Sequence, residues 1–302
     1  MLSAGRTTQK SGTNAKHPTP AGGGCTRDFR IYDEPMTDPR IISLNSPPAA
    51  AVQGAPRVFV LIPCAGNGSR ALAPGAAATL AKQYQPLAGQ AMVAHTVEAF
   101  RASGLALAGL WLLISPDDRV FETVFPDFPG LAGENLLRCG GATRADTVRQ
   151  GLQALLSTPG AAGPLDWVLV HDAARCLVTP AQIRQLVDTC QDDAVGGLLA
   201  QPLADTLKAE TLLDGAPGSR VSATLDRSGK WLAQTPQMFR VGALLDALLQ
   251  AERSGLAVTD ESSAMEALGL SPRLVRGSAH NLKITYPEDF ALAEALLQSR
   301  PR

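Results

Sequence analysis

A glycine-rich turn follows the first clear apolar run of the chain, VFVLIP at residues 58–63, and ends on a cation. Ligands of open α/β sheets bind beyond the carboxyl ends of strands, where glycines let backbone N–H groups approach a phosphate closely. The turn therefore indicates a phosphate site, although a purely structural tight turn fits this short pattern equally well. Its candidate residues are Cys64, Ala65, Gly66, Gly68 and Arg70.

A second cation, Lys82, opens the sequence Lys-Gln-Tyr after a segment of small residues, ALAPGAAATLA. A short Gly/Ala/Pro-rich segment bounded by Arg70 and Lys82 is typical of a flexible flap that closes over an anion. A lone solvated lysine is the alternative interpretation of Lys82.

The composition excludes several classes of protein. Lys+Arg and Asp+Glu number 27 and 28, whereas a protein that follows nucleic acid usually has a basic excess, so a small anionic ligand is favoured. The five cysteines and four histidines lack the spacing of a disulfide framework or a zinc site. The apolar run around Val168–Val170 is too short to cross a bilayer, so we expect a cytoplasmic protein with no membrane or nucleic-acid partner.

Residues 1–56 are rich in Thr, Ser, Gly and Pro and show no helical or strand period, so we expect a disordered N-terminal extension. The extension has no apolar signal region. Its first acidic residue is Asp28, so a transit peptide stays open as an alternative, and a natural start at Met36 is the simpler interpretation. Residues 57–302 are expected to form one catalytic domain.

From Arg57 onward, short apolar runs alternate with helical patterns. This alternation predicts an α/β fold with a mostly parallel sheet and helices on both faces. Strands are expected at 58–63, 110–115, 167–171 and 195–200, and helices at 93–102, 145–156 and after the Thr179 capping box.

The alternation stops between residues 203 and 239, where two β-forming runs flank a Gly/Pro turn. We expect this segment to be a β-hairpin arm that projects from the sheet. An isolated two-stranded arm is marginal in water, so a second copy of the chain should stabilise it. Beyond the arm, helices are expected at 243–253, after Thr259 and from Thr285, with a strand at 282–284.

An ordered set of short blocks gives a more specific interpretation: PCAGNGSR…KQY, GGATRADTV, VHDAAR, DTLK, LDR…TPQ, TDE and NLKITYPED. This set resembles the 2-C-methyl-D-erythritol 4-phosphate cytidylyltransferase family, from about Arg57 to the C-terminus. The resemblance implies a Rossmann-like nucleotidyltransferase fold and a homodimer with its arm at residues 203–239. It also implies Mg²⁺ or another divalent cation, with CTP and methylerythritol phosphate as substrates.

The resemblance also implies roles for individual residues. Arg70 and Lys82 match the pair that stabilises the transition state around the triphosphate, and Arg227 and Lys283 match the pair that orients the acceptor phosphate. The nucleotide-binding positions are Cys64, Ala65, Gly66, Gly68, Gly141, Arg144 and Thr147. The acceptor-binding positions are Asp172, Arg175, Thr206 and Thr259.

These roles agree with the chemistry of the reaction. The nucleophile is a phosphate oxygen whose second pKa lies near ~6, so it is already mostly dianionic at neutral pH. No side-chain base is needed, and the sequence offers no convincing catalytic histidine. Because two anions must meet, we expect catalysis by positioning and by positive charge.

Two positions depart from the family pattern. Cys64 stands where a small Ala is usual, and Ala142 stands in GGATRAD where an Asp or Glu is usual. The missing carboxylate at Ala142 bears on the recognition of the base rather than on the type of reaction.

Three alternatives stay open. A ribitol-5-phosphate cytidylyltransferase shares most of the loop motifs, and the region from Thr259 to Lys283 favours the methylerythritol type over it. An NAD(P)-binding oxidoreductase needs an acidic residue that binds the ribose. Lys82 and Gln83 lie near the position where this residue is expected, which argues against an oxidoreductase. A non-catalytic nucleotide-binding module does not explain cations at both ends of the chain.

Some family members carry a fused cyclase domain; since the chain ends at Arg302, we expect a monofunctional protein.

Overall fold

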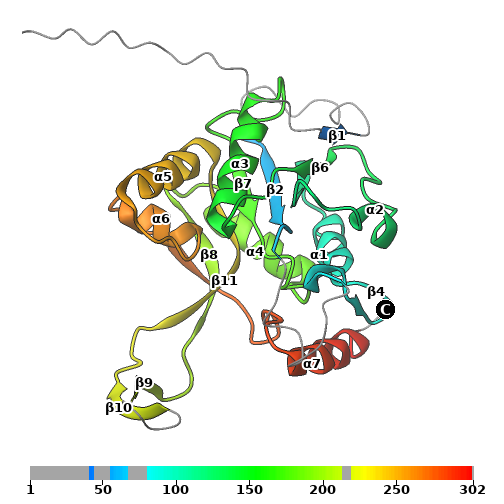
Figure 1. Cartoon of the computed structure of the whole chain (residues 1–302). Coiled ribbons are helices and arrows are strands. Elements are labelled where there is room, and N and C mark those ends of the chain that lie inside the picture. Colours follow the sequence, from blue (N-terminus) through cyan, green and yellow to red (C-terminus); the bar gives the residue numbers. More distant parts are fainter. Residues whose placement is uncertain (1–40, 44–54, 67–79, 213–218, 301–302) are drawn as a thin grey trace, which may run out of the picture. The chain divides into compact units, whose positions relative to one another are not determined.

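The computed structural model describes residues 41–43, 55–66, 80–212 and 219–300. The described residues form one unit around a sheet of eight described strands (Figure 1). Across the sheet the order is β1 (Ile41–Ser43), β6 (Glu134–Arg138), β5 (Leu107–Ile114), β2 (Val58–Pro63), β7 (Trp167–Val170), β11 (Trp231–Arg240), β8 (Gly196–Pro202) and β12 (Arg273–Arg276).

Most neighbouring strands run in the same direction, which confirms the expected α/β fold. Strands β6, β5, β2 and β7 are parallel in turn, and β12 is parallel to β8. Only β1 and β11 run antiparallel to their neighbours in this sheet, as far as the chain is described. The carboxyl ends of β2, β5, β6 and β7 therefore meet at one edge, where the motif residues follow them.

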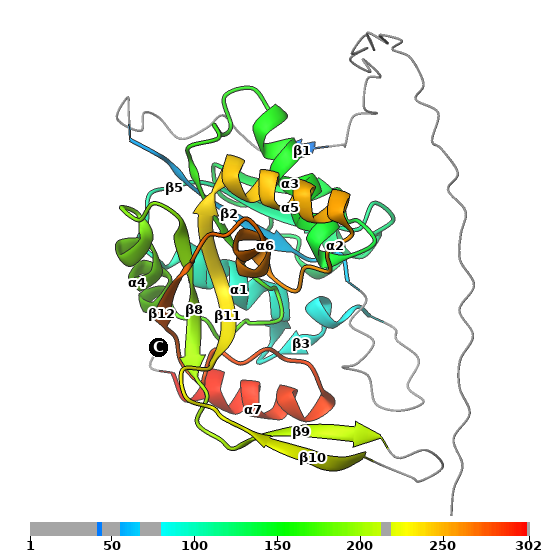
Figure 2. The same cartoon turned by 90° about the vertical axis from the view of Figure 1, so that its left-hand side faces the viewer.

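Helices cover both faces of the sheet (Figure 2). On one face lie α1 (Met92–Arg101) and α4 (Pro180–Cys190), and on the other lie α3 (Arg144–Ser157), α5 (Val241–Ser254) and α6 (Glu261–Ala267). The remaining described helices are α2 (Phe121–Val124), α7 (Pro287–Gln298) and a 3₁₀ turn at Lys82–Tyr84, which precedes the two-residue strands β3 (Pro86–Leu87) and β4 (Gln90–Ala91).

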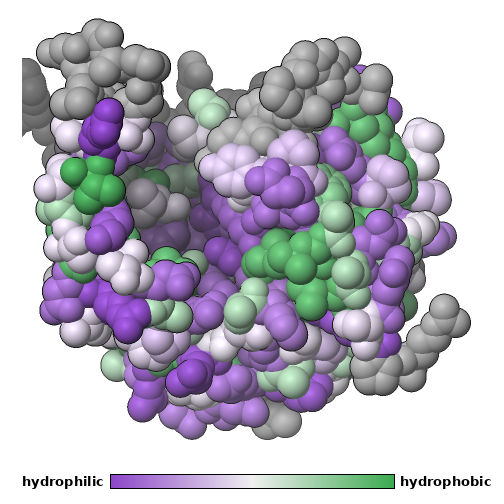
Figure 3. Space-filling view, turned by 90° about the horizontal axis from the view of Figure 1, so that it is seen from below, coloured by the Kyte–Doolittle hydropathy of each residue, from purple (hydrophilic) through white to green (hydrophobic). Residues whose placement is uncertain are grey.

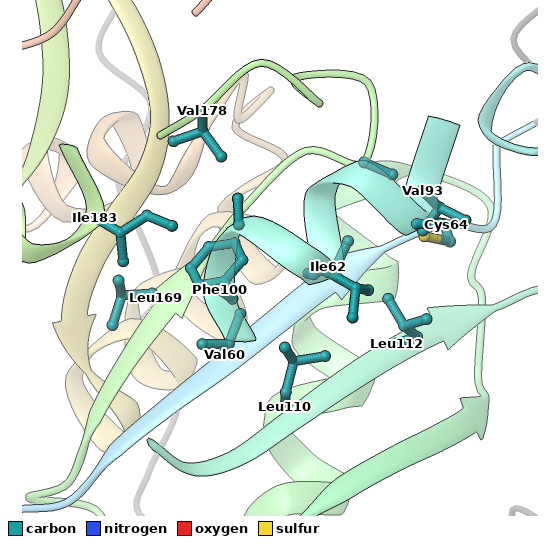
Figure 4. Close-up of a cluster of buried hydrophobic side chains, with 14 of the residues drawn as sticks. Val60, Ile62, Cys64, Val93, Phe100, Leu110, Leu112, Leu169, Val178 and Ile183 are labelled. Carbon is teal, nitrogen blue, oxygen red and sulfur yellow. The ribbon is translucent and has the colours of Figure 1, made fainter. Parts of the chain in front are cut away.

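Strand β2 is buried on both faces because its side chains alternate between the two helical layers. Val60 and Ile62 belong to the cluster under α1 and α4, whereas Phe59 and Leu61 belong to the cluster under α3 and α5. Figure 4 shows Val60 and Ile62 on the same side of the strand as Phe100 of α1. An apolar run without alternation was therefore the correct signal for this strand.

The arm consists of β9 (Leu207–Leu212) and β10 (Ser219–Leu225), an antiparallel pair that projects from the sheet (Figures 1 and 2). The prediction that the arm continues to residue 239 was wrong, because β11 lies between β7 and β8 in the central sheet. Pro236 lacks an N–H and argues against a central strand, but it sits where the β11–β8 register shifts between Ala233 and Gln237. The irregularity accommodates the proline.

Two further expectations differ from the structure. Residues 282–284 do not form a strand; the strand in that part of the chain is β12, at an edge of the sheet. Ile41–Ser43 form strand β1 inside the extension that was expected to have no regular structure. The rest of that extension, residues 1–40 and 44–54, lies outside the described residues.

Candidate functional site

A cavity of about 560 Å³ lies at the carboxyl ends of the parallel strands. Its wall comes from the loop after β2, the 3₁₀ turn, the residue after β5, the start of α3, the turn after β7 and Lys283. This is the edge at which open α/β sheets bind ligands. Seen from the side on which the arm projects, the surface is hollowed, and mainly hydrophilic residues surround the hollow (Figure 3).

The loop after β2 is held by its backbone. The Cys64 N–H donates to the Leu113 carbonyl at 2.7 Å, and the buried Gln83 side chain donates through Nε2 to the Cys64 carbonyl at 2.6 Å. In a trans peptide the C=O and the following N–H point in opposite directions. Because Gln83 fixes the Cys64 carbonyl, it also fixes the direction of the Ala65 N–H.

The Cys64 thiol belongs to the protein core rather than to the chemistry of the cavity. Its side chain is buried beside Val93 and Ile62 (Figure 4), and this burial raises the pKa of the thiol well above its usual range. The Cys64 side chain is therefore a neutral group that packs in the core. Only the backbone of Cys64, through its N–H and its carbonyl, holds the loop in place.

The start of α3 forms the opposite wall of the cavity. Thr143 caps the helix in a reciprocal capping box with Asp146. The Thr147 hydroxyl accepts from the Gly141 N–H at 3.1 Å and donates to the Thr143 carbonyl at 3.0 Å. A Cβ at Gly141 would stand 2.5 Å from the Cβ of Asp146, so this close turn requires glycine. Because the Thr147 hydroxyl donates its proton to the Thr143 carbonyl, this proton is not free to bind a ligand.

A network of ion pairs joins the start of α3 to the turn after β7, to α6 and to Lys283. Arg144 donates through Nε to Asp172 at 2.7 Å and through Nη1 and Nη2 to Glu261 at 2.6 and 3.0 Å. Lys283 Nζ lies 2.8 Å from the second Asp172 oxygen. Burial alone would raise the pKa of the Asp172 carboxyl, but Arg144 and Lys283 hold that pKa well below its usual range. Asp172 is therefore ionised at any pH at which the protein works.

Two more cations are anchored on backbone oxygens. Lys82 Nζ donates to the Ile284 carbonyl at 2.6 Å, and Arg175 donates to the Asn281 and Ala233 carbonyls at 2.8 and 3.1 Å. These contacts connect the loop before α7 to the 3₁₀ turn and to the turn after β7. The C-terminal segment thus completes a site whose other side lies 202 residues earlier in the chain.

A second cavity of about 230 Å³ adjoins the first. It shares Arg144, Asp172 and Lys283 with the larger cavity, and Arg175 and Thr259 also line it. The three shared residues therefore form a wall between two spaces, one large and one small.

The structure brings most of the predicted site residues together. Those that line one of the two cavities are Cys64, Ala65, Gly66, Lys82, Gly141, Arg144, Thr147, Asp172, Arg175, Thr259 and Lys283. Thr206 and Arg227 belong to the arm segment, are exposed and line neither cavity. Gly68 and Arg70 lie outside the described residues.

Sequence reasoning missed the residues that hold the others in place. Glu261 is 1% exposed and neutralises Arg144, while Thr235 and Asn281 are buried around Arg175 and Asp172. All three stand in blocks noticed in the sequence, TPQ, TDE and NLK. The signal available was their place in these blocks, which does not identify their partners.

The side chains that the structure describes do not fit a resident metal ion. Within residues 41–43, 55–66, 80–212 and 219–300, no group of three His, Cys, Asp or Glu side chains could hold one. Both Asp172 oxygens already accept from Arg144 and Lys283. A divalent cation here would have to arrive with phosphate oxygens as its main ligands. In the part of the chain that is described, no helix has the length and apolar character that a membrane crossing requires.

Comparison with known proteins places these features in one family. The profile of the family described as 2-C-methyl-D-erythritol 4-phosphate cytidylyltransferase matches residues 58–299. A protein of that name from Paraburkholderia phymatum is 50% identical over 243 residues, which are 80% of this chain and 96% of the relative. A bifunctional enzyme IspD/IspF from Albidiferax ferrireducens is 57% identical over 246 residues, 81% of this chain but only 54% of that longer protein.

Solved structures agree with this assignment. The crystal structure of a 4-diphosphocytidyl-2C-methyl-D-erythritol synthase matches with a TM-score of 0.66 at 38% identity, over 80% of this chain and 98% of that one. The 2-C-methyl-D-erythritol 4-phosphate cytidylyltransferase of Thermus thermophilus matches with a TM-score of 0.61 at 31% identity, over 80% and 99%. The chain belongs to the 2-C-methyl-D-erythritol 4-phosphate cytidylyltransferase family.

Proposed function

We propose that this protein transfers the cytidylyl group of CTP to 2-C-methyl-D-erythritol 4-phosphate and releases pyrophosphate. The product is CDP-methylerythritol, an intermediate of the non-mevalonate route to isoprenoid precursors. The observation that carries the proposal is the pair of adjoining cavities with Arg144, Asp172 and Lys283 in their common wall. Two phosphorylated substrates must meet in such a reaction, and the arrangement supports one space for each.

The larger cavity suits the nucleotide. The Ala65 N–H, directed by the Gln83–Cys64 hydrogen bond, supplies a backbone donor on one side, and the N-terminus of α3, which lines the cavity at Thr143 and Arg144, favours an anion on the other. Lys82 is placed to stabilise the negative charge that develops on the triphosphate. We assign Arg70 the same task by family resemblance, and it stays a prediction.

The smaller cavity suits the acceptor. Lys283 and Arg175 supply positive charge to it, and Thr259 lines it. Among the described residues around the two cavities there is no histidine that could serve as a base. This supports direct attack by the acceptor phosphate, whose dianion needs no deprotonation near neutral pH. The oxygen of that phosphate bonds to the α-phosphorus of CTP as the bond to pyrophosphate breaks.

Thr206 and Arg227 act, in this proposal, on the site of a second copy. Their exposure beside β9 and β10, at the base of the arm that projects from the sheet, supports a homodimer in which each arm segment reaches its neighbour's acceptor space. A divalent cation, most simply Mg²⁺, enters as part of the nucleotide substrate, because the described part of the protein offers it no dedicated cage. We keep a cytoplasmic location as a prediction.

The test is pyrophosphate release by the purified full chain with CTP and Mg²⁺, with the cytidylylated product identified by mass. Methylerythritol phosphate and ribitol 5-phosphate are compared at equal concentration, with a reaction lacking acceptor as the control. We expect turnover with methylerythritol phosphate. Preference for the ribitol compound would reassign the acceptor, and no release with either would leave only nucleotide binding. Replacing CTP by UTP tests whether Ala142 relaxes the choice of base.

A further inference from the structure

A buried histidine beside the cleft has no role assigned to it in the function proposed above. His171 follows β7, is 0% exposed, and packs edge-on against Phe100 of α1 with ring centroids 5.3 Å apart. One ring nitrogen, Nδ1, lies 3.1 Å from the Thr235 hydroxyl, and the other, Nε2, lies 3.2 Å from the Arg175 carbonyl. Both ring nitrogens are thus engaged at the turn that carries Asp172.

The direction of each hydrogen bond follows from the groups present. A carbonyl can only accept, so Nε2 of His171 carries a proton and donates to the Arg175 oxygen. Complete burial lowers the pKa of His171 to about 3, so the ring is neutral and Nδ1 is a bare acceptor. The Thr235 hydroxyl therefore donates to Nδ1 and uses a lone pair to accept from the Asp172 N–H at 3.0 Å.

The backbone groups of this turn have identified partners. The Asp172 carbonyl accepts from the Arg175 N–H, the Ala174 carbonyl accepts from the Ile284 N–H, and the Ala173 carbonyl accepts from the Thr96 hydroxyl. The Arg175 carbonyl also accepts from the Val178 N–H at 3.1 Å, so it stays paired without His171. The Asp172 N–H has only Thr235 among the described residues.

The Asp172 carboxylate connects this turn to two cations, Arg144 and Lys283. Arg144 keeps its place without that carboxylate, because Glu261 holds two of its nitrogens. Lys283 has Asp172 as its one ion-pair partner among the described residues. A displacement of Asp172 would therefore move Lys283 far more than Arg144.

We propose that His171 is a positioning residue: through the Thr235 hydroxyl it fixes the backbone of Asp172, and thereby the place of Lys283. The kinetic consequence rests on the proposed function, since it requires that Lys283 hold the acceptor phosphate. Thr235 lines the smaller cavity, but its proton and one lone pair are committed, so a ligand there has at most one lone pair left to use.

Thr235→Val tests the relay, because it keeps the shape and leaves the Asp172 N–H and His171 Nδ1 unpaired. We expect kcat/KM for the acceptor to fall about 10- to 100-fold, the range for an unsatisfied buried donor. KM for CTP should change less than about twofold, since Arg144 keeps Glu261. Thr235→Ser, which retains the hydroxyl, should restore most of the lost kcat/KM. A loss of thermal stability with unchanged kinetic constants would overturn the proposal.

Two variants at His171 separate its nitrogens. In His171→Asn the amide oxygen can stand near the place of Nδ1 and accept from Thr235, whereas in His171→Gln the amide NH₂ can replace only Nε2. We expect the Asn variant to keep more acceptor kcat/KM than the Gln variant. The double variant His171→Gln/Thr235→Val should be no worse than Thr235→Val alone, because the two residues act as one unit. The reverse order at position 171, or multiplied losses in the double variant, would refute the relay.

A spectroscopic reading separates this proposal from the proposed function. Long-range ¹H–¹⁵N correlation of the full chain should show His171 neutral, protonated on Nε2, and Thr235→Val should shift the Nδ1 and Asp172 amide resonances. This result needs no acceptor, so it holds or fails even if methylerythritol phosphate is not turned over. A proton on Nδ1 would overturn the proposal.

Discussion

Arg144 is expected to stabilise the fold chiefly by neutralising a buried carboxylate. Glu261 is 1% exposed, and its two oxygens accept from Arg144 at 2.6 and 3.0 Å. Removal of one partner from such a pair leaves an uncompensated charge, at a cost of about 3–5 kcal/mol. Arg144→Met keeps much of the side-chain volume and removes the charge, so its free energy of unfolding should fall by that amount. For a unit of this size, that corresponds to roughly 6–20 °C in Tm.

The assay is equilibrium unfolding in urea of the full chain, with each variant compared at one pH and salt concentration. The double variant Arg144→Met/Glu261→Gln removes the buried charge as well, so it should recover at least half of the lost stability. Asp172 does not add to the loss, because Lys283 and Arg175 still lie beside it. A double variant no more stable than Arg144→Met would refute the reasoning.

A matched control uses the same substitution at an exposed ion pair. Arg273 lies 3.6 Å from Asp193, and 55% of its side chain is exposed. Pairs of this kind contribute about 0–1 kcal/mol. Arg273→Met should therefore change stability by less than about 1 kcal/mol. An equal effect at Arg144 and Arg273 would mean that burial of Glu261 is not the cause.

Four further predictions concern the reaction and the pH dependence of activity and of stability. Lys82→Ala should lower kcat by about 10²–10³-fold, whereas Lys283→Ala should mainly raise the KM for the acceptor; equal effects of both in steady-state kinetics would contradict these roles. Mixing Lys82→Ala with Arg227→Ala under subunit exchange should restore about a quarter of wild-type activity, because half the dimers are mixed and each has one intact site. No recovery after confirmed exchange would place Arg227 in its own chain's site. The acid limb of activity should follow the acceptor phosphate near pH ~6 and stay unmoved in His171→Asn. The pKa of His171 is about 3 when folded, against about 6.5 unfolded, so wild-type stability should fall as pH drops between these values, and urea unfolding should show a flatter profile for His171→Asn.

The fold was predictable where burial leaves a simple pattern. VFVLIP became β2 with the expected ends, because a strand buried on both faces has no polar interruption. Thr179 caps α4 through the predicted box with Gln182, a purely local interaction. Local sequence carries both signals in full.

The fold was not predictable where a strand depends on distant partners. Trp231–Arg240 contains Pro236, and only the register of β8 shows that the proline falls where pairing is interrupted. Arg273–Arg276 forms an edge strand with one buried side chain, Val275, so neither alternation nor an apolar run marks it. Such strands are defined by the sheet that they join.

The candidate site shows the same division. The turn after β2 was expected to be a ligand site, and the structure places its residues 64–66 in the wall of the larger cavity, together with residues that follow β7. Glu261 could not be assigned to Arg144, because 117 residues separate them and nothing local indicates the pair. The candidate cations in the sequence also suggested a more positive cleft than the structure has. Asp172 and Glu261 form ion pairs with Arg144 and offset part of the positive charge.

The absence of a catalytic base from the proposed mechanism and the burial of His171 are connected. A reaction whose nucleophile is already a dianion has no use for a titrating imidazole. A His171 that exchanged protons near neutral pH would lose the Nδ1 lone pair, and with it the acceptor for the Thr235 hydroxyl. Burial keeps the ring neutral, so the geometry around Asp172 does not vary with pH. His171 therefore serves the reaction because it stays neutral. The pH dependence of catalysis then follows the ionisation of the acceptor phosphate.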